Sequence, residues 1–258
     1  MYRNTFLSVM FLACCFNGSL CAQSDAQIYE RTCDAKTYPF SDPSPVATPN
    51  NSYYPYFRFD GFSMQAQEKQ WKMVVLENDY VKLTVTPEIG GKIWGAIDKV
   101  NNKEFVYTNG VVKFRDVAMR GPWTSGGIEF NFGIIGHAPT CSTPIDYLTK
   151  KNVDGSVSCH IFSYEWITRT VWNVEINLPK DKAYFTTHTT WFNQSSIDQP
   201  YYQWMNAGYA TKTGTRFYYP GTYSIGHSGD LHPYPIDEEG RDVSWYDNNN
   251  FGASKSLH

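Results

Sequence analysis

The sequence is poor in the features that mark several common classes of protein. Its formal net charge is only −3, whereas a nucleic-acid-binding surface needs a basic stripe. After residue 22, no stretch approaches the ~20 consecutive apolar residues of a membrane-spanning helix. We therefore expect neither nucleic acid nor the membrane interior as a partner.

Metal-binding signals are scarce as well. Three of the six cysteines fall in the first 22 residues, which leaves Cys33, Cys141 and Cys159. An odd number allows at most one internal disulfide and leaves one thiol over. No pair has the C-x-x-C spacing of a zinc site, so we expect no metal and no cofactor.

What the sequence does have is an unusual number of aromatic residues. They make up 17% of the chain, with 19 Tyr and 8 Trp. Aromatic and β-branched residues favour pleated, half-buried surfaces. Tyr and Trp rings also offer a flat apolar face with a polar edge, which suits stacking on the C–H face of a sugar. Composition alone favours a β-rich core over a sugar site.

The first 22 residues have the pattern of a secretory signal. Arg3 supplies the positive start, residues 5–16 form a short apolar run, and Ala22 ends a small-residue cleavage site. Lipoprotein processing at Cys14 is an alternative that the neighbouring residues favour less. We expect an exported protein, located in the periplasm or outside the cell.

Two segments follow the signal. Residues 23–70 form a polar lead-in with four prolines between residues 39 and 49 and an aromatic cluster at residues 53–57. A proline-rich segment forms neither a long helix nor a central strand. We expect this lead-in to pack on the domain that follows it, residues 71–258.

From Trp71 onward the pattern is one of strands and turns. Val81, Leu83 and Val85 alternate with polar residues, which is the period of a half-buried strand. No window shows an amphipathic helical period, and no internal repeat is present. Further candidate strands are residues 73–76, 93–97, 105–107, 157–166, 169–178, 183–192 and 201–210. Short strands with regular turns favour a β-sandwich or barrel.

Several motifs carry a resemblance to a known superfamily. The segment NDYVKLTVTPEIGGKI at residues 78–93 resembles the opening of the galactose mutarotase (aldose 1-epimerase) relatives. A closer resemblance is to an uncharacterised bacterial branch of that superfamily, often fused to tetratricopeptide repeats. The motifs that carry it are RGPWTSGGIEFNF at 120–132, GHAP at 136–139, WMNA at 204–207 and YPG at 219–221.

The resemblance covers roughly residues 55–258 and implies an all-β fold. That fold is the galactose-mutarotase-like β-super-sandwich, with a sugar site on its concave face. Relatives continue beyond the end of this sequence, and residues 252–258 read as the entry into another strand. We therefore expect a sandwich truncated at its C-terminus, without the late-strand Glu that acts as general base in the mutarotases.

Residues 120–139 concentrate the candidate catalytic groups. Five glycines make the backbone permissive for tight turns or close ligand approach. Arg120 offers a rigid fork of donors, and strand alternation places Glu129 opposite its two apolar neighbours, away from the core. His137 follows closely, so the three together suit acid–base chemistry at a sugar ring. The alternative is a structural Arg120–Glu129 ion pair, with His137 capping a loop.

Other residues are candidate substrate contacts. Trp123 and Trp204 are expected as stacking walls and Asn206 as a hydroxyl partner. The resemblance adds a second set, because the comparable region lines the sugar pocket in the mutarotase relatives. This set is Tyr219, His227 and Asp230. An exposed aromatic loop is an equal alternative, and a metal held by Asp230 and the histidines beside it matches no standard spacing.

Two function classes remain open at this stage. One is an exported carbohydrate-active enzyme, either an epimerase or a glycoside hydrolase, working by acid–base chemistry at an anomeric carbon. The other is a non-catalytic carbohydrate-binding module, and an inert structural domain is a weaker third reading. A second carboxylate facing Glu129 would distinguish the first two classes.

The signal pattern makes one prediction. The mature protein is expected to begin near Gln23, because the apolar run is followed by small residues up to Ala22. N-terminal sequencing of the exported protein measures this directly. A retained Met1 would contradict it.

Overall fold

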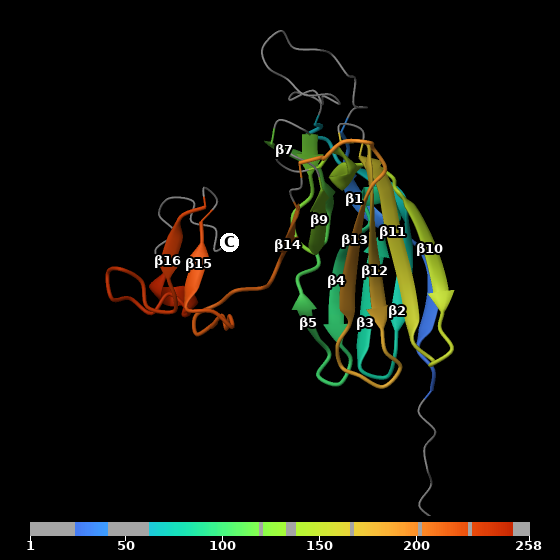
Figure 1. Ribbon diagram of the computed structural model, residues 1–258. Coiled ribbons are helices and arrows are strands. Elements are labelled where there is room, and N and C mark those ends of the chain that lie inside the picture. Colours follow the sequence, from blue (N-terminus) through green and yellow to red (C-terminus); the bar gives the residue numbers. More distant parts are fainter. Residues whose placement is uncertain are drawn as a thin grey trace, which may run out of the picture.

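The chain folds into a two-layer sandwich of β-sheets (Figure 1). This computed structural model describes residues 24–40, 62–118, 121–132, 138–165, 168–200, 203–226 and 229–249. Within those ranges the regular secondary structure is strand apart from three single-turn 3₁₀ helices, and there is no α-helix. The predicted all-β fold is confirmed. No helix in the described ranges is long and apolar enough to cross a membrane.

The larger sheet has eight strands. Their order is β14-β9-β4-β3-β2-β1-β6, and β5 pairs with β4. In chain order the strands are β1 (Gln27–Tyr38), β2 (Gln67–Glu77), β3 (Val81–Thr86), β4 (Lys92–Asp98), β5 (Lys103–Val106), β6 (Val112–Lys113), β9 (Ile128–Phe132) and β14 (Gln203–Ala207). Neighbours are antiparallel except β1 and β6, which run parallel.

The smaller sheet packs over the larger one, and two hairpins complete the described chain. The smaller sheet is antiparallel, in the order β10 (Asp146–Lys151), β11 (Val157–Glu165), β12 (Thr170–Leu178) and β13 (Thr186–Asn193). The hairpins are β7 (Arg115–Ala118) with β8 (Gly121–Trp123), and β15 (Tyr223–Ile225) with β16 (Leu231–Pro233). Figure 1 shows the β15–β16 hairpin standing apart from the sandwich, beyond the chain that leaves β14.

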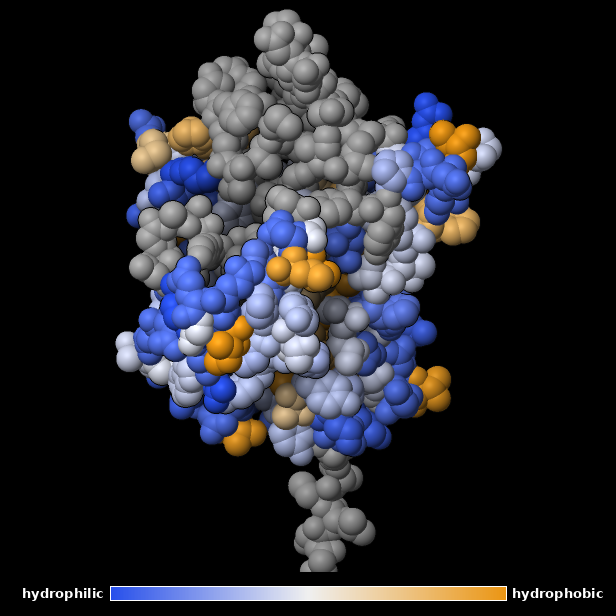
Figure 2. All heavy atoms as spheres, turned by 60° about the vertical axis from the view of Figure 1, so that its left-hand side comes forward, coloured by the Kyte–Doolittle hydropathy of each residue, from blue (hydrophilic) through white to orange (hydrophobic). Residues whose placement is uncertain are grey.

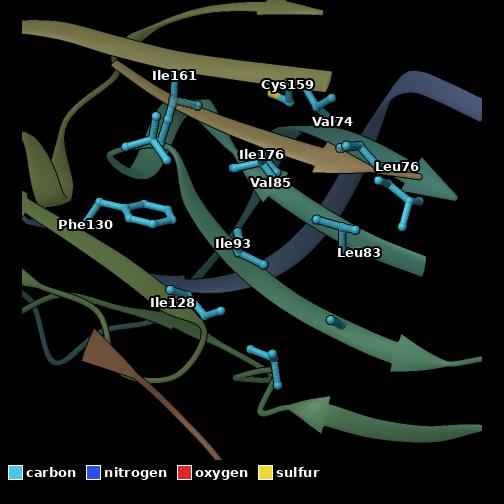
Figure 3. Close-up of a cluster of buried hydrophobic side chains, with 14 of the residues drawn as sticks. Val74, Leu76, Leu83, Val85, Ile93, Ile128, Phe130, Cys159, Ile161 and Ile176 are labelled. Carbon is cyan, nitrogen blue, oxygen red and sulfur yellow. The ribbon is translucent and has the colours of Figure 1, made fainter. Parts of the chain in front are cut away.

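The core lies between the two sheets and follows from strand alternation. Along β12, buried and half-buried residues alternate from Thr170 to Leu178 without a break. On β3, Val81, Leu83 and Val85 are all buried, as their period of two predicts. Figure 3 shows side chains from both sheets meeting in this cluster.

A second apolar cluster covers part of the outer face of the larger sheet. Its members are Trp71, Met73, Ile89, Trp94, Val112 and Phe114. Because the neighbouring residues Val74 and Leu76 face the inner core, strand β2 is buried on both faces. This explains why residues 73–76 form an unbroken apolar run rather than an alternating one.

Strand β1 lies within residues 23–70, which were predicted to form a polar lead-in outside the domain. It pairs with β2 from Gln27 opposite Glu77 to Thr37 opposite Gln67, so it is an integral strand of the larger sheet. The strand ends immediately before Pro39. The prolines therefore disfavour a strand only from Pro39 onward. The prediction that the whole lead-in lacks a strand of the sheet was wrong for residues 27–38. Residues 41–61, with the aromatic cluster, lie outside the described ranges.

The three cysteines within the described ranges are free thiols. Cys141 and Cys159 are buried, and Cys33 is partly exposed on β1. Sheet pairing and core packing thus hold the described part of the sandwich together.

The side chain of Asn78 joins the two sheets at one end of the sandwich. Its Oδ1 accepts hydrogen bonds from the backbone N–H groups of Tyr80 and Val81, at 2.8 and 2.7 Å. Its Nδ2 donates to the carbonyl oxygens of Pro179 and Lys182, at 2.7 and 2.8 Å. One buried amide therefore fastens the β2–β3 turn to the β12–β13 connection.

Removing this amide is expected to destabilise the fold markedly. Asn78→Ala deletes four hydrogen bonds from a buried side chain to backbone groups that are buried or part-buried, each worth about 1 kcal/mol. We expect the free energy of unfolding to fall by about 2–4 kcal/mol in urea denaturation. The control is Asn101→Ala, since Asn101 is exposed and its side chain bonds to Asp98 in the neighbouring turn. Equal losses in the two variants would contradict this account.

Candidate functional site

Strand β9 divides its side chains between two environments. Ile128, Phe130 and Phe132 point into the core between the sheets. Glu129 and Asn131 therefore lie on the outer face of the larger sheet, as alternation predicted for Glu129. Both are nevertheless buried, with 3% of Glu129 and 0% of Asn131 exposed. Such burial requires that their polar atoms find partners.

Glu129 is held by groups from three strands. Its Oε1 accepts hydrogen bonds from Asn131 Nδ2 at 2.8 Å and from Asn206 Nδ2 at 3.4 Å. Asn206 lies directly opposite Glu129 in the pairing of β14 with β9. Lys92 Nζ, from the first residue of β4, lies 3.8 Å from Oε2. The carboxylate thus faces an ammonium group and two amides.

Lys92 is the cation of this buried pair. Only 2% of the residue is exposed, and its ammonium group also donates to the backbone oxygen and the hydroxyl of Thr124. The Trp123 ring lies 5.8 Å from Nζ. Burial lowers the pKa of Lys92, and the negative charge of Glu129 counteracts that effect. Lys92 and Glu129 stabilise each other's charged forms, because either charge alone would be costly here.

Asn131 connects the ion pair to the segment that covers it. Its Oδ1 accepts a hydrogen bond from the Ala138 backbone N–H at 3.0 Å and one from the Cys141 thiol at 3.1 Å. Ala138 and Cys141 bracket the start of the 3₁₀ helix η2 (Pro139–Ser142). Burial raises the pKa of the Cys141 thiol well above its usual value, and nearby Glu129 raises it further. Cys141 therefore stays protonated and acts as a hydrogen-bond donor rather than a nucleophile.

A tight glycine junction places the site residues. Gly127 has a φ of +67°, and a Cβ there would collide with the carbonyl oxygen of Ile93. Its N–H donates to the Tyr107 oxygen at 2.8 Å, and its own oxygen accepts from Gly208 at 2.7 Å. Only glycine satisfies both the left-handed backbone and the close approach. The junction joins the ends of β5 and β14 to the start of β9, beside Lys92.

The structure brings some of the predicted site residues together. Glu129 and Asn206 are hydrogen-bonded, and Trp123 lies beside the Lys92 of the same cluster. Trp204 is two residues from Asn206 on β14, and so lies on the same face of that strand. Trp123, Trp204 and Asn206 are all half-buried, which leaves part of each side chain accessible.

Other predicted site residues lie elsewhere. Tyr219 and Asp230 belong to the hairpin region that stands apart in Figure 1. The Tyr219 ring packs against Phe217 and Tyr234, and Asp230 accepts a hydrogen bond from His232 at 2.6 Å. The structure thus does not bring either residue to Glu129. Arg120, His137 and His227 lie outside the described residues.

Lys92 is the residue of the candidate site that sequence reasoning missed. The alternative considered for Glu129 was an ion pair with Arg120, whereas Lys92 is the cation found beside it. A signal was present, because Lys92 directly follows Gly90-Gly91 and begins the apolar strand at residues 93–97. A charged residue at the start of a buried strand needs a partner of opposite charge.

Within the described residues, the sandwich and its polar cluster define an all-β domain with an ionised pair buried on the outer face of the larger sheet. The chain belongs to a family described as a domain of unknown function (DUF5107), whose model matches residues 48–258.

A solved structure shares the fold. It is a TPR-domain containing protein from Parabacteroides distasonis ATCC 8503, 25% identical in sequence, with a TM-score of 0.70. The match covers 78% of this chain and 35% of that protein, so this chain spans about a third of its length. The presence of a TPR domain in that protein agrees with the expectation that relatives carry tetratricopeptide repeats.

Breaking the buried pair from one side should be costly. Lys92→Met leaves the Glu129 carboxylate buried without its ammonium partner, which typically costs about 3–5 kcal/mol. Adding Glu129→Gln to Lys92→Met should recover part of this loss, because the uncompensated charge is removed. Urea denaturation of the three proteins measures both effects.

The matched control is Lys82→Met on neighbouring strand β3. Lys82 pairs with Glu77 at 3.4 Å, but 31% of its side chain is exposed, and such a pair contributes at most about 1 kcal/mol. If Lys92→Met and Lys82→Met cost the same, Lys92 does not stabilise a buried charge.

Proposed function

We propose that this chain is a carbohydrate-recognising domain whose sugar site lies on the outer face of the larger sheet, at β9 and β14. The observation that carries the proposal is the arrangement of Trp204 and Asn206. These two half-buried side chains share one face of β14, and Asn206 is hydrogen-bonded to the fixed carboxylate of Glu129. An accessible aromatic ring beside oriented polar groups is the usual composition of a site for a small polar ligand.

The described surface that is visible in Figure 2 is also compatible with a polar ligand. On the coloured part of Figure 2, apolar residues are scattered singly among hydrophilic ones and form no continuous apolar face. Protein interfaces and lipid-binding faces usually show a larger apolar patch. A hydroxyl-rich ligand that stacks on one or two rings needs no such patch.

The proposal has two further parts: the domain belongs to the galactose mutarotase superfamily, and the protein is exported. The motifs at residues 78–93 and 120–132 resemble galactose mutarotase relatives, and a two-sheet all-β sandwich is the architecture that this resemblance implies. The signal-like pattern of residues 1–22 supports export, which would place the site among extracellular or periplasmic glycans.

Acid–base chemistry at the anomeric carbon is the second candidate function. It is favoured by the surroundings of Glu129, since amide donors and the Lys92 ammonium favour the ionised carboxylate. An ionised carboxylate accepts a proton, so Glu129 would serve as a base rather than an acid. Binding alone is the better supported function, because only 3% of Glu129 is exposed and little of it is available to a substrate.

Calorimetry against a panel of neutral and acidic mono- and oligosaccharides tests the proposal. We expect at least one sugar to bind, and Trp204→Ala to weaken that binding by about 10-fold or more through lost stacking. Glu129→Gln should retain binding and abolish any turnover if Glu129 is a base, and should only weaken binding if the domain is a receptor.

The control variant is Phe192→Ala. Phe192 is an aromatic residue of β13, in the other sheet, with 60% of its surface exposed. Its loss should leave sugar affinity unchanged. The proposal falls if no sugar in the panel binds, or if Phe192→Ala weakens binding as much as Trp204→Ala does.

A further inference from the structure

Two histidines flank a glutamate on the outer face of the smaller sheet. His160 on β11 lies directly opposite Glu175 on β12, and Glu175 lies directly opposite His188 on β13. Val174 and Ile176, on either side of Glu175, face the core. The row of three ionisable side chains is therefore on the outer face, on the other side of the sandwich from the Glu129 cluster.

The carboxylate in the middle of this row is oriented by a buried hydroxyl. Ser158, which is fully buried, donates to Glu175 Oε1 at 2.7 Å. The Ser158 oxygen accepts amide hydrogens from Asn152 at 2.9 Å and Asn177 at 3.0 Å. A hydroxyl has one proton and two lone pairs, so the two amides direct its proton to Glu175. Support of this kind from outside the ligand set is typical of carboxylates that bind metal ions.

The separation of His160 from Glu175 is also informative. The distance from His160 Nε2 to Glu175 Oε1 is 3.7 Å, which is too long for a hydrogen bond. Two donors that share a tetrahedral zinc ion, each at about 2.0–2.1 Å, lie about 3.3 Å apart. The first two donors are thus already near the spacing of metal ligands.

The third donor is one strand away. Neighbouring strands lie about 4.8 Å apart, so the imidazole of His188 can reach an ion seated above Glu175. His188 is exposed and free to change rotamer. Among the residues that the structure describes, no three His, Cys, Asp or Glu side chains are yet arranged to hold a metal ion. Binding therefore requires His188 to turn toward Glu175.

We propose that His160, Glu175 and His188 bind a divalent transition-metal ion of the zinc class. Two imidazoles and a carboxylate are a donor set that suits Zn²⁺, and water would complete the coordination. The proposal is independent of the sugar site, because it shares no residue with the Glu129 cluster.

Calorimetric titration of the full chain with Zn²⁺ alone tests this site. The protein carries no affinity tag and has Cys33→Ser, since Cys33 is a partly exposed thiol that could bind the ion itself. We expect one saturable site. His160→Ala and His188→Ala should each weaken it by about 10-fold or more, and Ser158→Ala should weaken it through Glu175.

His232→Ala is the matched control, because His232 also lies beside a carboxylate, Asp230, but in the separate hairpin. It should leave Zn²⁺ affinity unchanged. Thermal melts check folding, and Zn²⁺ should raise the melting temperature of the parent protein but not of His188→Ala. Absence of saturable binding, unchanged affinity in His188→Ala, or loss of binding in His232→Ala alone would each overturn the proposal.

Discussion

The pairing of Lys92 with Glu129 is the constraint on which the outer face of the larger sheet depends. Moving either charge out of water costs several kcal/mol, so each can be buried only where the other is in place. A hydrogen bond from Lys92 to Thr124 and one from Asn131 to Glu129 further stabilise the two buried charges. Because Thr124 follows hairpin strand β8 and Asn131 on β9 binds Ala138 and Cys141 at the η2 segment, the ion pair also helps to position the segments that cover the sheet.

The outer face of the larger sheet changes in character from one side to the other. Over β2 and β4 it is apolar and covered by the cluster that includes Trp71 and Trp94. Toward β9 it becomes the buried polar network of Glu129, and at β14 it ends in half-buried Trp204 and Asn206. Among the described residues, the polar network is therefore sheltered on the side of the apolar cluster and borders half-buried side chains at the β14 edge. This arrangement explains how a buried carboxylate can lie next to half-buried side chains at the sheet edge.

Much of the fold was predictable because strand alternation is a local property. The period of two at Val81, Leu83 and Val85 was sufficient to identify β3 and its buried face. Alternation also placed Glu129 on the correct face of β9. Strand β1 was missed because the prolines that follow it were taken as typical of the whole segment. Its strand partner, β2, lies far along the chain, so the local sequence does not reveal the pairing.

The candidate site was predictable only in part. Which side chains meet Glu129 depends on the register of β14 and on the turn before β4, neither of which local sequence reveals. Lys92 was therefore overlooked, whereas Asn206, which was predicted to contact a sugar hydroxyl, lies beside Glu129. Tyr219 and Asp230 were grouped with Glu129 through resemblance, and resemblance does not determine where a hairpin beyond the sandwich lies.

Strand β14 carries Trp204 and Asn206 but is the edge of its sheet, five residues long and paired only with β9 along the strand order. Short edge strands separate from their neighbours at a lower free energy than that of global unfolding. Each such excursion removes the Asn206 amide from Glu129 and admits water to the carboxylate. A ligand that touches both β9 and β14 binds only the closed arrangement. Occupancy of the proposed site is thereby linked to amide hydrogen-exchange protection of the five residues from Gln203 to Ala207.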